Sequence, residues 1–118
     1  IGYHWYETWY TECYPHCDGF DNLHQNLALV SASYPDKPIL FTEGTVEGFT
    51  PVRYQYWPNA ERYGMSMIRD FNRGNSGWTD WNLLLDERGG PNHVENFCFA
   101  PVHGDTQTGE LIFTPSYY

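Results

Sequence analysis

The stretch PILFTEG, residues 38–44, decides the fold class, and the rest of the sequence extends it. Three consecutive apolar residues lead directly to the carboxylate of Glu43. Consecutive rather than alternating apolar residues are typical of a strand covered on both faces, as in parallel sheets. The stretch therefore predicts a buried strand over residues 39–43 and raises the question of why this strand ends on a glutamate.

Helices are predicted on both sides of this strand. Apolar residues at positions i, i+4 and i+7, which are Leu23, Leu27 and Val30, predict a helix over residues 21–33. The sequence YPDKP ends it, because proline cannot continue a helix. A second helix is predicted over residues 60–72 and is followed by GNSG. Its expected apolar face consists of Ala60, Gly64, Met67, Ile68 and Phe71.

Two further strands complete the expected pattern, one over residues 1–6 and one over residues 78–85, WTDWNLLL. Strands that alternate with helices predict βαβ units and a parallel sheet. The loops after the strands are long and those after the helices are short, which is typical of the (β/α)₈ TIM barrel. A whole barrel takes roughly 250 residues, so the 118 residues predict a partial barrel. A hairpin over residues 99–113 and a helix start at TPSYY follow.

Composition and charge narrow the classes of partner. Aromatic residues make up 19% of the chain, far more than in a disordered protein. Six Lys and Arg stand against fifteen Asp and Glu, which gives a net charge of −9. Such a surface repels phosphate backbones, so no nucleic-acid partner is expected. No apolar run approaches the roughly 20 residues of a spanning helix, so no stable membrane insertion is expected.

The three cysteines leave their redox state open. An odd number leaves at least one thiol unpaired within the chain. Cys13 and Cys17 flank His16, but no second Cys/His pair at suitable spacing completes a zinc site. A short-loop disulfide between Cys13 and Cys17 and two free thiols both fit the sequence. No metal and no cofactor is expected.

Side chains suited to sugar chemistry gather where the predicted strands end. Because the carboxyl ends of barrel strands meet at one mouth, these side chains are expected to converge. Aromatic rings pack against the apolar face of a pyranose, and a carboxylate can attack its anomeric carbon. The residues concerned are His4, Trp5 and Tyr6, then Glu43, then Trp78, Asp80, Trp81 and Asn82.

Three stretches that contain these residues resemble glycoside hydrolase family 30, within its glucosylceramidase-like branch. They are HWY at 4–6, FTEG at 41–44 and GWTDWNLLLDERGGPNHVENF at 77–97. The resemblance implies that residues 1–118 are the C-terminal part of a glycosidase TIM-barrel domain. The three predicted strands would be strands six to eight, followed by the hairpin. The rest of the barrel and a β-rich side domain would lie outside the chain.

The resemblance also implies roles for individual residues. The family cleaves β-glycosidic bonds with retention, and its nucleophile matches Glu43, at the end of strand seven. Glu47 is the nearest rival, but it falls in the following loop, and a rigid element holds a catalytic group better. Asp80 is expected to orient loops by hydrogen bonds. Tyr6, Trp81 and Asn96 are expected to bind the sugar, and His4 and Trp5 to support the pocket wall.

The chain departs from the family pattern in one respect, because it contains no Asn-Glu-Pro motif, which carries the family's acid/base glutamate. The expected activity, hydrolysis of a β-glucoside such as glucosylceramide, therefore belongs to a full-length parent, and the fragment alone is expected to be inactive. Expected partners are a carbohydrate or glycolipid substrate and the remainder of the barrel. Resemblance implies a secreted or lysosomal location.

Other functions fit the sequence as well. Within the family, β-1,6-glucanase or xylanase activity is an alternative. Outside it, the aromatic content also fits a non-catalytic carbohydrate-binding module, although such modules are usually β-sandwiches. The isolated chain could also fail to fold, because open parallel edges would leave apolar surface in water.

Overall fold

The computed structural model describes residues 1–4, 18–45, 53–91, 93 and 97–118. The chain forms two compact units. The first unit comprises Ile1–Gly44 and Gly64–Trp81, and the second comprises Thr45–Tyr63 and Asn82–Tyr118. In chain order the elements are β1 (Gly2–His4), α1 (Asp18–Ser33), β2 (Ile39–Glu43), η3 (Arg53–Gln55), α2 (Trp57–Phe71), β3 (Asn75–Trp78), β4 (Leu84–Asp86), β5 (Val102–Gly104), β6 (Leu111–Phe113) and η4 (Pro115–Tyr117).

The first unit confirms the expected parallel arrangement. Its strands lie in the order β1-β2-β3, and both neighbouring pairs are parallel. Helix α1 connects β1 to β2, and α2 lies between β2 and β3 in the chain. The predicted strand over 39–43 has the observed bounds, and α1 begins three residues before the predicted helix. A parallel sheet with helical connections excludes a β-sandwich carbohydrate-binding module.

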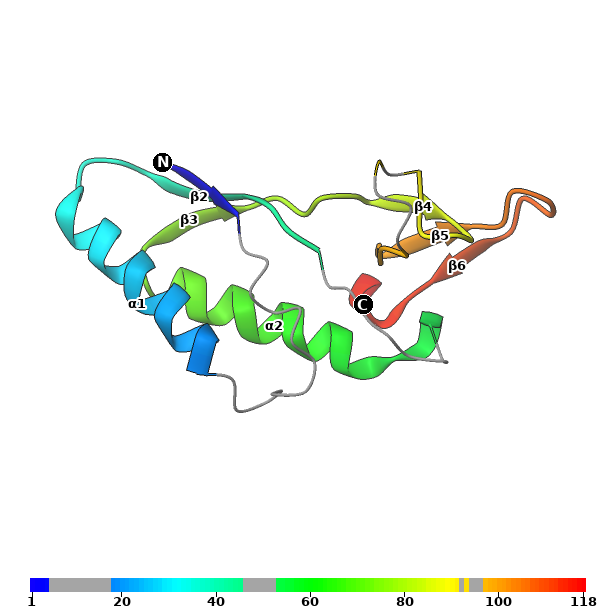
Figure 1. The fold of residues 1–118 in the computed structure, drawn as a ribbon, viewed down its shortest axis with the longest axis horizontal. Helices are drawn as coiled ribbons and strands as arrows, with labels where there is room; N and C mark the ends of the chain where they lie inside the picture. The colour runs from blue at the N-terminus through cyan, green and yellow to red at the C-terminus, as the bar shows by residue number, and fades with distance from the viewer. Residues whose placement is uncertain (5–17, 46–52, 92, 94–96) are drawn as a thin grey trace. The chain divides into compact units, whose positions relative to one another are not determined.

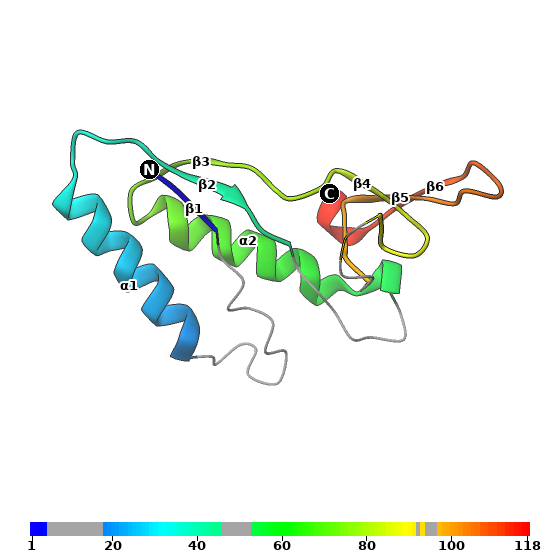
Figure 2. The same ribbon diagram turned by 45° about the horizontal axis from the view of Figure 1, so that its top comes forward.

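Helices cover one face of this sheet. Figure 1 and Figure 2 show α1 and the first unit's part of α2 on the same side of the three strands. Burial along β2 alternates accordingly, since Ile39 and Phe41 are buried whereas Leu40 is 42% exposed. The prediction of a strand covered on both faces is therefore wrong for this chain. Although its first three residues are all apolar, β2 alternates between buried and exposed side chains.

The third strand was predicted too far along the chain. Strand β3 spans Asn75–Trp78 rather than 78–85, and the later residues Leu84–Asp86 form β4 in a separate sheet. Gly74 explains the early start, because its φ of 95° turns the chain directly after α2. A Cβ at this position would lie 2.1 Å from Oγ of Ser31, so only glycine fits.

The buried face of α2 is also different from the predicted one. Ile68 and Phe71 are 65% and 47% exposed, although both were expected to face the core. The buried positions of α2 are Asn59, Arg62, Tyr63, Ser66 and Asp70. Burial of Asp70 is offset by a hydrogen bond from Tyr3 and by the neighbouring imidazole of His24. Polar partners, rather than apolar periodicity, therefore set the orientation of this helix.

The second unit contains a mixed sheet in the order β4-β5-β6. Strands β5 and β6 are antiparallel and form the predicted hairpin, while β4 pairs with β5 in parallel. The carboxylate of Asp105 accepts the backbone N–H groups of Gln107 and Thr108, and Gly109 adopts a φ of 74°. These features close the hairpin turn. The predicted helix start at TPSYY is a single 3₁₀ turn, η4.

His103 lies at the centre of the second unit and is fully buried. Its Nδ1 lies 2.9 Å from the backbone oxygen of Asp86, and its Nε2 accepts the N–H of Ala100. Its ring stacks on that of Phe97, with centroids 5.6 Å apart. Both contacts require a neutral imidazole protonated on Nδ1, and burial lowers the pKa of His103.

Candidate active site

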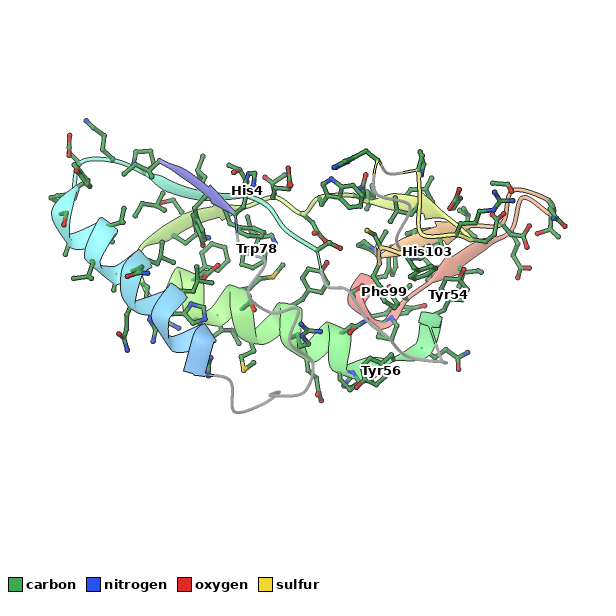
Figure 3. All side chains as sticks on the ribbon, viewed as in Figure 1. His4, Tyr54, Tyr56, Trp78, Phe99 and His103 are labelled. Carbon is green, nitrogen blue, oxygen red and sulfur yellow. The ribbon has the colours of Figure 1, made fainter. Side chains whose placement is uncertain are left out.

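Glu43 is the last residue of β2, the central strand of the parallel sheet. Its side chain is 38% exposed, so water reaches the carboxylate. His4, the last residue of β1, lies opposite it in the strand register. His4 Nδ1 and Glu43 Oε1 are 3.8 Å apart, and Figure 3 labels His4 at the end of its strand. The carboxyl ends of two adjacent strands therefore present an imidazole and a carboxylate together.

Trp81 joins the same end of the sheet through its backbone. The N–H of Trp81 donates to the carbonyl oxygen of Gly44 at 3.0 Å and to Oδ1 of Asp80 at 2.8 Å. The N–H of Thr79 likewise donates to the carbonyl oxygen of Phe41. Residues 79–81 thus continue alongside β2 beyond the end of β3. Trp81 therefore lies beside Gly44, the residue after Glu43. The carboxylate of Asp80 stabilises the backbone at Trp81 by accepting its N–H.

Trp78 is the last residue of β3, and its half-buried ring packs against the interior of the first unit. Its ring lies 4.0 Å from that of Phe41, centroid to centroid, and Phe41 contacts Tyr3 at 5.5 Å. Trp78 is labelled in Figure 3. Because Phe41 is fully buried, the Trp78 ring covers the core at the carboxyl end of β3. Trp78 therefore lies at a strand end as expected, and its contact with a sugar stays a prediction.

Several predicted residues cannot be placed in this site. Asn82 belongs to the second unit. The others lie outside the described residues, and they are Trp5, Tyr6, Cys13, His16, Cys17, Glu47 and Asn96. The roles of Tyr6 and Asn96 in sugar binding and the redox state of Cys13 and Cys17 thus stay predictions. Among the three cysteines, Cys98 is described, and it is buried.

A buried polar network beneath the sheet was not predicted from the sequence. The hydroxyl of Tyr3 donates to Oδ2 of Asp70 at 2.6 Å, and His24 Nδ1 lies 3.1 Å from Oδ1 of the same carboxylate. Burial and the adjacent carboxylate raise the pKa of Tyr3. A signal was present in the sequence, because Ser66 and Asp70 are four residues apart and mark one polar helix face.

The described part of the chain offers neither a metal site nor a membrane-spanning helix. Within it, no three His, Cys, Asp or Glu side chains come together in a way that could hold a metal ion. None of its helices combines the length and the apolar composition that a membrane crossing requires.

Comparison with known proteins gives a family match over the whole chain. Residues 1–118 match the glycosyl hydrolase family 30 TIM-barrel domain. The mouse lysosomal acid glucosylceramidase is 37% identical over 67 residues, which are 57% of this chain and 13% of that protein. A Caenorhabditis elegans protein, whose name assigns it provisionally to the glucosylceramidases, is 33% identical over 121 aligned residues. The chain covers 21% of the length of that relative.

Solved structures agree with this match. The crystal structure of SrfJ from Salmonella typhimurium aligns with 99% of this chain at a TM-score of 0.73 and 34% identity. The chain covers 23% of that structure. An endo-β1,6-glucanase aligns with 80% of this chain and 21% of its own at a TM-score of 0.63 and 24% identity, which supports the fold alone. The chain therefore belongs to glycosyl hydrolase family 30 and forms part of its TIM-barrel domain.

Proposed function

We propose that the protein containing this chain is a retaining glycoside hydrolase that acts on a β-glucoside such as glucosylceramide. The observation that carries the proposal is the position of Glu43 at the carboxyl end of the central parallel strand, with its carboxylate accessible to solvent. In TIM-barrel enzymes this end of the strands carries the active site. The strand order β1-β2-β3 supports three consecutive barrel strands, and the family resemblance suggests that they are strands six, seven and eight.

Glu43 is the proposed nucleophile. A retaining enzyme uses two carboxyl groups about 5–5.5 Å apart, of which one attacks the anomeric carbon and the other protonates the leaving oxygen. The chain contains no Asn-Glu-Pro motif, so we assign the acid/base glutamate to the rest of the protein. Because the chain spans less than a quarter of the length of these relatives, the proposed activity requires the complete barrel.

The sugar contacts of the proposed site come from side chains near the strand ends. The ring of Trp81 would pack against the apolar face of the pyranose, because aromatic side chains bury large apolar areas. Tyr6 and Asn96 are proposed to hydrogen-bond the sugar hydroxyls. The names of the mouse and Caenorhabditis elegans relatives, which both refer to glucosylceramidase, support glucosylceramide as the substrate.

Substitution of Glu43 in the full-length protein tests this function. Glu43→Gln should lower kcat for an aryl β-glucoside by orders of magnitude, because an amide cannot form the covalent intermediate. Azide should partly restore turnover to Glu43→Gly and yield the α-glycosyl azide. Glu110→Gln, an exposed glutamate in the hairpin, serves as the matched control and should retain activity. An active Glu43→Gln enzyme, or a β-azide product, would refute the assignment.

A further inference from the structure

Strand alternation alone would place Glu43 on the wrong face of the sheet. Ile39 and Phe41 are buried beneath the helices, and residue 43 shares their odd numbering. In a regular strand, residues i, i+2 and i+4 line one face. A regular β2 would therefore direct Glu43 toward the helix-covered face, away from the open face of Leu40.

The register between β1 and β2 shows that the strand is not regular there. Tyr3 lies opposite Phe41, but the next residue, His4, lies opposite Glu43. Thr42 is consequently an extra residue in β2, with no partner of its own in β1. This arrangement is a β-bulge, a feature that bends a strand and redirects the side chain beside it.

Side-chain contacts identify the face to which Glu43 is redirected. Tyr3 points toward the helices, since its hydroxyl reaches Asp70 of α2. Its neighbours Gly2 and His4 thus face the other way, and a Cβ on Gly2 would lie 3.4 Å from Cγ2 of Thr42. The carboxylate of Glu43 lies 3.8 Å from the imidazole of His4. Thr42 and Glu43 therefore lie on the same open face although they are consecutive.

Side chains hold β2 where the regular ladder is interrupted. The hydroxyl of Thr42 donates to the carbonyl oxygen of Tyr3 at 3.2 Å. A second irregularity occurs on the other edge of β2, where Ser76 is the extra residue in β3. There the buried side chain of Asn75 accepts the backbone N–H of Phe41 at 3.1 Å. Both bonds satisfy backbone groups next to the interrupted register.

We infer that Thr42 is a positioning residue, whose bulge and hydroxyl bond turn the Glu43 carboxylate to the open face of the sheet beside His4. The inference rests on the proposed function, because it concerns the geometry of the proposed nucleophile. Thr42 itself touches no reacting atom in this scheme. It acts through the backbone that carries Glu43.

The test compares Thr42 variants of the full-length protein with an aryl β-glucoside. Thr42→Val keeps the branched shape and removes the hydroxyl, and it should lower kcat about tenfold or more, as small misplacements of a catalytic group do. KM should change by less than about twofold, since the sugar contacts are intact. Thr42→Ser keeps the hydroxyl and should restore most of the rate. Thr42→Ala repeats the test if the valine methyl impairs folding.

Matched controls separate the outcomes. Thr108→Val removes another exposed threonine hydroxyl that bonds to backbone, the N–H of Glu110, and should leave kcat unchanged. Thr42→Val and Thr42→Ala enzymes with wild-type kcat would overturn the positioning role, and so would a serine variant as slow as the valine variant. If Glu43→Gln were active, the proposed function itself would fail. An inactive Glu43→Gln beside fully active Thr42 variants would refute the positioning role alone.

Discussion

The hydroxyl of Tyr3 and the carboxylate of Asp70 meet at 2.6 Å although 67 positions separate them in the sequence. This hydrogen bond joins the first strand of the parallel sheet to α2. Asp70 is fully buried. Nδ1 of the equally buried His24 lies 3.1 Å from Oδ1, the other oxygen of the Asp70 carboxylate. A buried carboxylate is stable only when its oxygens have partners, so this network fixes which face of α2 packs against the sheet.

Tyr3→Phe should lower the free energy of unfolding by about 1–3 kcal/mol, because the Asp70 carboxylate loses a buried donor. Thermal or urea unfolding of the protein measures the difference. Tyr34→Phe removes the hydroxyl of a tyrosine that is 54% exposed and should change stability by less than about 0.5 kcal/mol. Equal effects of the two substitutions would contradict the role given to the Tyr3–Asp70 bond.

Acidification should destabilise the second unit through His103. Its pKa is lowered in the folded state, so the unfolded state binds the proton more readily. The stabilisation is therefore fully present above about pH 6.5, the ordinary value, and is lost as pH falls below it. A thermal midpoint that drops between pH 7.5 and pH 5, with a smaller drop in His103→Gln, is expected. His93→Gln removes an exposed histidine and should keep the wild-type slope.

Three glycines should respond differently to alanine. Gly89→Ala should destabilise the protein by more than about 1 kcal/mol, because its φ is 73° and a Cβ would lie 2.6 Å from the backbone nitrogen of Cys98. Gly109 has a similar φ, but no atom lies within 4 Å of an added Cβ, so Gly109→Ala should lower the free energy of unfolding by less. Gly64→Ala lies within α2 with no atom near its Cβ and should stabilise by about 0.5–1 kcal/mol. Thermal midpoints of the three variants give the order.

Trp81→Ala should weaken sugar binding in the full-length protein. In a Glu43→Gln background, which prevents turnover, loss of the ring should cost about 1.4 kcal/mol, or about tenfold in Kd for a β-glucoside. Titration calorimetry measures this Kd. Trp57→Ala, at a tryptophan that is 57% exposed and bonded to Glu61, provides the control and should bind normally. Unchanged binding by the Trp81 variant would remove it from the proposed site.

Local patterns in the sequence predicted much of the first unit. The run ending at Glu43 gave the bounds of β2, and the spacing of Leu23, Leu27 and Val30 placed α1 to within three residues at its start. The turn residues of the hairpin were equally informative, because Asp105 and Gly109 have local conformational roles. Patterns of this kind depend on neighbours along the chain, so they can be interpreted from the sequence alone.

Errors arose where long-range contacts compete with local pattern. WTDWNLLL was predicted as one strand, but the N–H groups of Thr79 and Trp81 bond to carbonyls of the first unit, whereas Leu84–Asp86 pair with β5. The apolar face expected on α2 lies exposed at Ile68, because the polar partners of Asp70 rotate the helix the other way. Neither pairing is encoded by residue spacing.

The sequence by itself determined the order of strands and helices, the parallel sheet that this order requires, and the glutamate that ends the central strand. The tertiary structure decided which way that glutamate faces. By alternation Glu43 belongs with Ile39 and Phe41 beneath the helices, and only the extra residue Thr42 in the pairing with β1 brings it beside His4. Alternation is a property of one strand, whereas a bulge exists only between two strands, so it arises when they pair.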